Sequence, residues 1–230
     1  DPEDADVSIV GSHAVERCGT SIAALGDVNG DGLDDVAIGC PWYTTTGGVL
    51  GRTALFFGRP RGEWAGITAS EQADSLIVGG GNETKTGTWV SGVGDVNGDG
   101  YADLVVGSPF YAAGTGRLGL KLGGAQPGTF LPTQSMDTLD RRYDGLLFDE
   151  LGAFVRGGDV NGDGVDDLLV GAPGWSGDTG RLGVLFGSAS LPATGDLWDI
   201  ADLELRGSAG NERVGTRAAA ADLDGDGVGD

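Results

Sequence analysis

Short apolar runs separated by glycine-rich polar turns make up most of this chain. Three of the runs are rich in branched residues and stop at Gly-x-Pro, in "DDVAIGCPW", "ADLVVGSPF" and "DDLLVGAPG". Partly alternating runs that follow a glycine precede them, as in "CGTSIAALGD" and "TGTWVSGVGD". Short runs with this alternation and these bounding turns are typical of β-strands, and no segment shows a helical period. The pattern therefore predicts an all-β protein.

The runs recur with a near-constant period. An acidic loop begins at positions 27, 95, 159 and 222, so the spacings are 68, 64 and 63 residues. Besides the strands on either side of the loop, each unit has a third run that opens with Gly-Arg and a fourth short run. The third runs lie at 51–58, 116–124 and 180–188, and the fourth at 74–80, 144–148 and 203–208, with a similar run at 5–12. Such a period predicts one supersecondary unit per repeat.

Units of four antiparallel strands repeated along a chain are typical of β-propeller blades. A β-sandwich also has many short strands, but the regular period favours the propeller. We expect one propeller segment over 1–230, with repeats over 14–78, 79–147 and 148–207 and a partial repeat over 208–230. About three and a half blades leave open sheet edges, so the rest of a propeller or partner copies would complete the fold.

Each acidic loop follows the pattern D-x-[ND]-x-D-G-x-x-D, which predicts a calcium site. Alternate side chains and one backbone carbonyl supply the hard oxygens that Ca²⁺ prefers, and Mg²⁺ fits less well because it demands a tighter octahedron. The glycine after the third ligand permits the turn. The predicted ligands, with the seventh-position carbonyl in each loop, are Asp27, Asn29, Asp31, Leu33 and Asp35; Asp95, Asn97, Asp99, Tyr101 and Asp103; Asp159, Asn161, Asp163, Val165 and Asp167; and Asp222, Asp224, Asp226, Val228 and Asp230.

An EF-hand begins with the same pattern but needs a glutamate at position 12 and flanking helices. Position 12 is Ile38, Val106 and Val170 here, within predicted strands. The aspartate at position 9 replaces that glutamate. The loops therefore predict up to four Ca²⁺ ions held in β-hairpins.

The stretches "CGTSIAALGDVNGDGLDDVAIGCP", "TGTWVSGVGDVNGDGYADLVVGSP" and "LGAFVRGGDVNGDGVDDLLVGAP" resemble FG-GAP repeats, as in the integrin α-subunit β-propeller and many bacterial surface or secreted proteins. The resemblance covers essentially the whole chain and implies one Ca²⁺ per loop. It departs from the family in two ways. The "FG" element lacks its aromatic, since Cys18, Thr86, Leu151 and Val214 stand there, and the family's propellers usually have seven blades.

The acidic net charge of the chain agrees with cation binding and argues against a nucleic-acid partner. The 230 residues carry 35 acidic and 14 basic side chains, a net charge of -21. Nucleic-acid binding needs a cationic surface, so it is excluded. No apolar run is long enough to cross a bilayer, and we expect no membrane insertion within this segment. The chain opens without an initiator methionine or signal peptide, which predicts a mature or excised segment.

Two cysteines, Cys18 and Cys40, lie symmetrically about Asn29 in the first loop. Across an antiparallel hairpin they would face each other and could form a disulfide in an oxidising compartment. A pair of small buried thiols is the alternative.

No catalytic motif accompanies these repeats. His13 is the only histidine and has no zinc or triad spacing, and nearly all paired carboxylates belong to the predicted calcium loops. Trp42 and Trp175 follow Gly-x-Pro turns and are candidates for a contact surface. Arg52, Arg117 and Arg181 recur at one blade position, where structural ion pairs are expected.

The sequence therefore predicts a non-enzymatic, calcium-binding module at the cell surface or outside the cell. Its expected role is adhesion, protein–protein interaction or structural assembly, including fibres formed by blade completion. The expected partners are a protein or glycan ligand, or other copies of the chain. The alternative is a non-catalytic accessory module of a larger secreted enzyme, such as a hydrolase.

Overall fold

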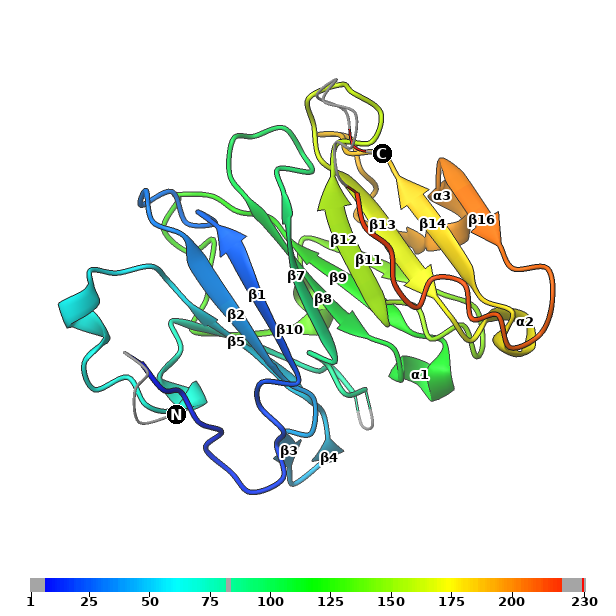
Figure 1. The fold of residues 1–230 in the computed structure, drawn as a ribbon. Coiled ribbons are helices and arrows are strands. Elements are labelled where there is room, and N and C mark those ends of the chain that lie inside the picture. The colour runs from blue at the N-terminus through cyan, green and yellow to red at the C-terminus, as the bar shows by residue number, and fades with distance from the viewer. Residues whose placement is uncertain (1–6, 82–83, 221–228, 230) are drawn as a thin grey trace.

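Three four-stranded antiparallel units stand side by side in the computed structural model, which describes residues 7–81, 84–220 and 229 (Figure 1). Each unit uses the four strands of one repeat, so the predicted propeller blades are confirmed. Blade 1 contains β1 (Ser21–Gly26), β2 (Asp35–Cys40), β5 (Arg52–Phe56) and β6 (Ser75–Val78). Blade 2 contains β7 (Trp89–Gly94), β8 (Asp103–Ser108), β9 (Arg117–Lys121) and β11 (Arg141–Asp144). Blade 3 contains β12 (Phe154–Gly158), β13 (Asp167–Ala172), β14 (Arg181–Leu185) and β16 (Leu203–Arg206).

A short parallel strand from the following repeat extends two of these blades. Strand β10 (Thr133–Ser135) pairs with β6, and β15 (Thr194–Asp196) pairs with β11. The sheet of blade 3 ends at β16. A parallel bridge between Val10 and Ala69 repeats the arrangement before blade 1, because Val10 lies where a preceding fourth strand would. Each repeat therefore reaches back across its predecessor.

The remaining elements are short. They are β3 (Thr44–Thr45), β4 (Gly48–Val49), α1 (Tyr111–Gly114), α2 (Trp175–Asp178), α3 (Leu197–Ile200), and the 3₁₀ turns η2 (Arg61–Trp64), η3 (Ser70–Gln72) and η4 (Met136–Thr138). Over the described part of the chain, no helix has the length and apolar character needed to span a bilayer.

The fourth strand of blade 2 differs from the sequence prediction. The apolar run 144–148 was the expected strand, but β11 is the polar stretch Arg141–Asp144. Tyr143 is the buried residue of that strand, whereas Leu147 and Phe148 are 62% and 63% exposed in the loop after it. The arginines of this strand donate to backbone carbonyl oxygens, Arg141 to that of Asp140 and Arg142 to that of Asp137, and only Tyr143 is buried, so hydrophobicity alone placed the strand wrongly.

Glycines let neighbouring blades meet backbone to backbone. A Cβ on Gly39, in the middle of β2, would lie 2.0 Å from the carbonyl oxygen of Gly87 in the next repeat. The same clash would arise between Gly107 and Gly152, at 2.1 Å. No side chain fits at such a distance. The glycine of the "FG" element and the glycine of Gly-x-Pro are therefore two sides of one contact between blades.

The apolar core fills the space between blades. Between blades 1 and 2 it contains Leu25, Ala37, Leu55, Ile77, Val90, Leu104, Val106 and Met136. Between blades 2 and 3 it contains Val93, Val105, Leu118, Leu120, Tyr143, Val155, Leu168 and Val170. Each blade is thus stabilised by its neighbours, as in other repeat architectures.

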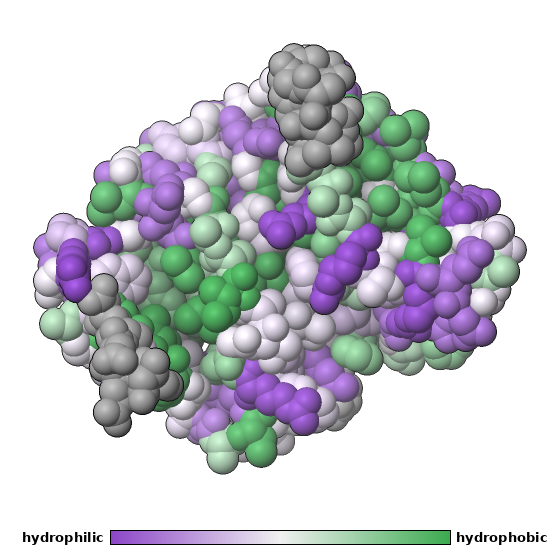
Figure 2. Space-filling view, viewed as in Figure 1, coloured by the Kyte–Doolittle hydropathy of each residue, from purple (hydrophilic) through white to green (hydrophobic). Residues whose placement is uncertain are grey.

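Blade 1 has an uncovered apolar face on its other side. Ile22 is 65% exposed, while its counterpart in blade 2, Val90, is 3% exposed. We call this surface the blade 1 face. It contains a cavity of about 350 Å³, which is lined by Val7, Ile9, Ile22, Val36, Ile38, Phe56 and Trp64. Figure 2 shows hydrophobic side chains gathered over β1 and β2 beside the N-terminal segment.

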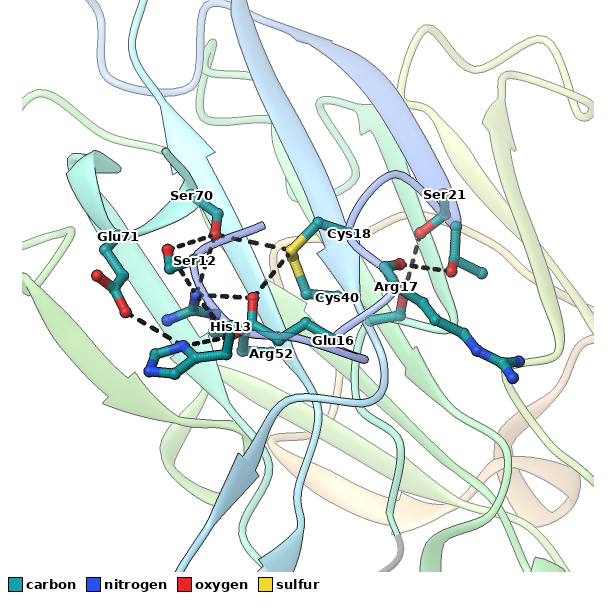
Figure 3. The surroundings of a disulfide bond; sticks show 12 residues. Ser12, His13, Glu16, Arg17, Cys18, Ser21, Cys40, Arg52, Ser70 and Glu71 are labelled. Carbon is teal, nitrogen blue, oxygen red and sulfur yellow. Dashed lines mark hydrogen bonds and ion pairs between the residues drawn. A yellow bond between two sulfur atoms is a disulfide. The ribbon is translucent and has the colours of Figure 1, made fainter. Parts of the chain in front are cut away.

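One pair of neighbouring positions has different chemistry in each blade. In blade 1, Cys18 and Cys40 form a disulfide (Figure 3). In blade 2 the same places hold Thr86 and Ser108, whose hydroxyls are 2.7 Å apart and hydrogen-bonded. Blade 3 has Leu151 and Ala172, both fully buried. The residue before the "FG" glycine and the last residue of the second strand can therefore be linked by a covalent, a polar or an apolar contact.

The recurring arginine at the start of the third strand is held the same way in each blade. Its guanidinium pairs with a carboxylate and stacks on the aromatic residue three positions after the end of the second strand. The sets are Arg52 with Glu16 and Tyr43, Arg117 with Asp144 and Tyr111, and Arg181 with Asp149 and Trp175. These arginines are structural, as the sequence predicts.

Exchanging the link of blade 1 for that of blade 2 tests this equivalence. The double variant Cys18→Ala/Cys40→Ala should lose about 3 kcal/mol of unfolding free energy, because the disulfide closes a loop of 22 residues. Cys18→Thr/Cys40→Ser should recover about 1 kcal/mol through the hydroxyl pair. Urea unfolding of both variants, with reduced wild type as the control, measures the difference. Equal stability of the two variants would contradict the equivalence.

Candidate metal centres

The three described acidic loops lie along one edge of the molecule, at the top of Figure 1. Each joins the first two strands of a blade, β1 to β2, β7 to β8, and β12 to β13. The edge opposite carries β3, β4, α1 and α2. The blades stand side by side in the same orientation, so the same hairpin loop of each blade lies on the same edge, and so do all three predicted ligand sets.

Within each loop the backbone wraps around the first aspartate. Asp27 Oδ1 accepts hydrogen bonds from the amides of Gly30 and Asp31, and its Oδ2 accepts one from Gly32. Asn29 Oδ1 accepts from Asp31 N. Loop 3 repeats this arrangement around Asp159, and loop 2 repeats it around Asp95 with the amides of Asp99 and Gly100. The repeated geometry follows from the shared D-x-N-x-D-G sequence.

The aspartate at position 9 has a second role, which the sequence did not reveal. Both oxygens of Asp103 accept backbone hydrogen bonds, Oδ2 from Val96 N at 2.9 Å and Oδ1 from Gly123 N at 2.8 Å. Asp35 and Asp167 bind the equivalent amides in their blades. This carboxylate therefore joins the hairpin loop to the chain just after the third strand.

The glycines that complete this link recur in the sequence as "FFG", "KLGG" and "LFG". They are Gly58, Gly123 and Gly187, and each lies against its loop. A Cβ on Gly123 would be 2.3 Å from the carbonyl oxygen of Ala102, and one on Gly187 would be 2.1 Å from that of Asp166. Their regular spacing from the loops was the available signal for this contact.

Burial makes the position 9 carboxylates costly to ionise. Asp35, Asp103 and Asp167 are fully buried. Burial raises the pKa of Asp103 to about 7, against the opposing effect of its two backbone hydrogen bonds. The pKa values of Asp35 and Asp167 are raised for the same reason. In contrast, the pKa of the half-buried Asp159 is lowered by the amides around it, that of Gly164 first.

Each loop is also bonded to the next blade. Ala102 N donates to Asp27 O, Asp166 N donates to Asp95 O, and Gly229 N donates to Asp159 O at 2.7 Å. Gly124 N and Ser188 N donate to the carbonyl oxygens of Val28 and Val96 in the preceding loops. We call this line of hydrogen bonds the loop seam. The candidate metal centres therefore lie at the boundary between blades.

No basic side chain neutralises these acids: the ion pairs found between described residues all lie away from the aspartates of the predicted ligand sets. Nor do three carboxylates of the described loops come within 4.8 Å of one another. Over the described residues, the one acidic or thiol group that meets this distance is Glu16 with Cys18 and Cys40. Those sulfurs are bonded to each other, and Glu16 pairs with Arg52, so this group is structural (Figure 3).

Other predicted sites have simpler surroundings. His13 is exposed and lies 2.7 Å from Glu16 (Figure 3). Trp42 and Trp175, the candidates for a contact surface, are half-buried beneath cations, Arg17 and Lys85 on Trp42 and Arg181 and Arg206 on Trp175. The fourth predicted ligand set lies outside the described residues; its members are Asp222, Asp224, Asp226, Val228 and Asp230.

Comparison with known families identifies the repeated unit. The FG-GAP repeat model matches three stretches, residues 19–56, 86–119 and 151–185. Each stretch runs from the glycine contact, through the acidic loop, into the third strand. The matches therefore contain the three described acidic loops, which are the candidate metal centres.

The chain is also similar to integrin alpha subunits. It is 34% identical to integrin alpha-PS5 of Drosophila melanogaster over 167 residues, which cover 71% of this chain and 16% of the relative. It is 31% identical to integrin alpha pat-2 of Caenorhabditis elegans over 197 residues (78% and 15%) and to integrin alpha-IIb of Mus musculus over 172 residues (72% and 16%). The chain thus spans less than a fifth of the length of these relatives.

Two substitutions in loop 2 separate the roles of its carboxylates. In EDTA, Asp103→Asn should lower the unfolding free energy by about 1–3 kcal/mol, because an amide cannot accept both backbone hydrogen bonds. Asp99→Asn, at an exposed position of the same loop, should change it by less than about 0.5 kcal/mol. Chemical denaturation measures both values. Equal losses in the two variants would show that the buried link has no special role.

Proposed function

This chain belongs to the FG-GAP repeat family, with integrin alpha subunits among its relatives, and on that premise we propose that it is a calcium-binding, non-enzymatic propeller module. We infer that it works outside the cell or at its surface, in adhesion or protein interaction, with a protein or glycan partner. The disulfide supports this location, because disulfides persist in oxidising compartments. The partners and activity of the much longer relatives enter here as part of the proposal.

The observation that carries the calcium proposal is a set of buried carboxylates without basic partners. A buried anion needs a compensating charge, and Asp35, Asp103 and Asp167 have only backbone amides. The more exposed aspartates at positions 1 and 5 add further negative charge at each loop. A divalent cation bound among these oxygens would supply the missing charge, and Ca²⁺ suits a flexible ring of oxygen ligands.

The ligands we propose are the side chains at positions 1, 3, 5 and 9 and the carbonyl at position 7. In the described loops these are Asp27, Asn29, Asp31, Leu33 and Asp35; Asp95, Asn97, Asp99, Tyr101 and Asp103; and Asp159, Asn161, Asp163, Val165 and Asp167. The fourth loop follows the same pattern in sequence, so we propose up to four ions. The chain's own contribution is to orient these oxygens with loop amides and to fix position 9 against the third strand.

A calcium titration tests this proposal. Millimolar Ca²⁺ should raise the melting temperature well above its value in EDTA, because a ligand that binds only the folded state stabilises it. At 100 times the dissociation constant the gain is about 2.7 kcal/mol per independent site. Calorimetry should count one ion fewer in Asp95→Ala/Asp99→Ala than in wild type, with Asp137→Ala, an acid outside the loops, as the control. Identical melting curves in calcium and EDTA would rule the proposal out.

Structural assembly is a second candidate function, favoured by two uncovered surfaces. Leu205 of β16 is 56% exposed, while its counterpart Tyr143 is fully buried by the next blade. The blade 1 face lies at the other end of the row of blades (Figure 1), and Ile22 on it is 65% exposed. We propose that these surfaces pack on further blades, either of the same protein or of another copy. Docking between copies would be head to tail and would build a closed ring or a fibre.

Light scattering of this chain distinguishes docking between copies from a monomer. The mean mass should rise with concentration, and Ile22→Asp should reduce this rise because it places a charge on the blade 1 face. Leu147→Asp, at an equally exposed apolar residue in a loop, is the matched control. A mass that stays monomeric at every concentration would contradict assembly between copies, without affecting the calcium proposal.

The alternative function is that of a non-catalytic accessory module of a larger secreted enzyme. The same calcium-stabilised scaffold would then position a catalytic domain encoded beside it. A catalytic domain in the parent gene would favour this alternative.

A further inference from the structure

A polar cleft of about 390 Å³ opens beside the second acidic loop. All its walls come from the second repeat: the β7–β8 loop, the end of β9, the segment 128–131, and β10 with η4. Its polar lining residues are Asp99, Lys121, Thr129, Gln134, Thr138 and Asp140. The volume is in the lower part of the range for small-molecule sites. We call this feature the loop 2 cleft.

Lys121 distinguishes blade 2 from its neighbours. The equivalent residues in blades 1 and 3, Phe56 and Leu185, are buried and apolar, whereas blade 2 places a charged side chain there that is only 5% exposed. Its ammonium donates to Asp140 at 2.6 Å and lies 5.2 Å from the ring of Phe130. An ammonium has three donors, so one such hydrogen bond leaves capacity for a ligand oxygen.

Gln134 provides a second polar group in the cleft, with a side-chain donor that no described residue accepts from. Its side-chain nitrogen is buried and makes no hydrogen bond within the described part of the chain. Gln134 lies on β10, the strand that reaches back to pair with β6, so its backbone is fixed by Ile77. Buried polar groups are nearly always hydrogen-bonded, and an unpaired amide facing a cleft calls for an external acceptor.

The lining selects one class of ligand. Asp99 and Asp140 outnumber the single ammonium, so the cleft repels anions. The donors of Lys121 and Gln134 need acceptors, while the carboxylates and the hydroxyls of Thr129 and Thr138 accept hydrogen bonds. A hydroxyl group both donates and accepts, so neighbouring hydroxyls satisfy both sets at once. We propose that the loop 2 cleft binds a neutral saccharide, through Lys121, Gln134 and Asp140 at its base and Asp99 at its rim.

This site names the ligand class for the proposed binding module, and it rests on that module role. It does not require calcium, because Lys121 and Gln134 act without an ion. Hydrogen bonds of a buried side chain also fix the walls of the cleft relative to one another. Asp103 joins Val96 in the loop to Gly123 beside Lys121, so one buried carboxylate ties two walls together.

A sugar titration in EDTA tests the inference apart from the calcium proposal. The probes are maltose, lactose, cellobiose and chitobiose, followed by saturation-transfer NMR. At least one should bind, and Gln134→Ala and Lys121→Leu should each weaken binding about 5-fold or more, as expected for the loss of one hydrogen bond. Lys121→Leu should fold, because blade 3 has Leu185 at that position. Thr133→Ala, an exposed neighbour on β10, is the control and should bind as wild type does.

Two results would overturn the inference. One is the absence of binding by all four disaccharides, and the other is equal binding by wild type, Lys121→Leu and Gln134→Ala. Repeating the titration in millimolar Ca²⁺ shows whether loop 2 contributes. Tighter binding in calcium that is lost in Asp99→Ala would place Asp99 in the site, and unchanged affinity would confine the site to Lys121, Gln134 and Asp140. A failure of calcium to stabilise the fold would leave the measurement in EDTA interpretable.

Discussion

A buried aspartate in each blade, Asp35, Asp103 or Asp167, is the interaction on which the other features of this fold depend. It lies at the start of the second strand, yet its oxygens bind the amides of the loop before it and of the glycine after the third strand. Three segments of each blade therefore meet at one carboxylate. Because that group is buried, its charge destabilises the fold unless compensated, which is why its pKa rises and why a cation at the loop suits it.

Glycine explains how separate blades become one structure. Backbone meets backbone where Gly39 faces Gly87, and again at the equivalent pairs in the next blades. On the edge with the acidic loops, the loop seam adds hydrogen bonds from each blade to the loop before it. Ordering one loop thus affects two blades, so an ion bound there would stabilise a boundary as well as a hairpin. The apolar core between the blades then excludes water along the whole contact.

The repeat period, the acidic loops and the Gly-Arg strands were enough to predict the strands of each blade, because each has a local signature. Prediction failed where the determinant is a distant partner. Strand β11 is polar in sequence because it buries a single side chain, Tyr143, and the apolar run after it is exposed. Strands β10 and β15 have only three residues and form by pairing with a preceding blade. The second role of Asp103 was equally hidden, because Gly123 lies 20 residues away and contributes only its amide.

The departures from the repeat carry as much information as the repeat itself. Where all three blades agree, as at the glycines, the buried aspartates and the paired arginines, the residues maintain the scaffold. Lys121 departs from the apolar residues of its counterparts, and a buried charge in place of Phe or Leu costs stability without improving the packing. It lines the same cleft as Gln134, whose side-chain nitrogen has no partner among the described residues, on a wall that Asp103 holds in place. A fixed scaffold with one costly polar substitution is the arrangement expected of a binding site, since rigid elements hold ligand groups more precisely than mobile ones.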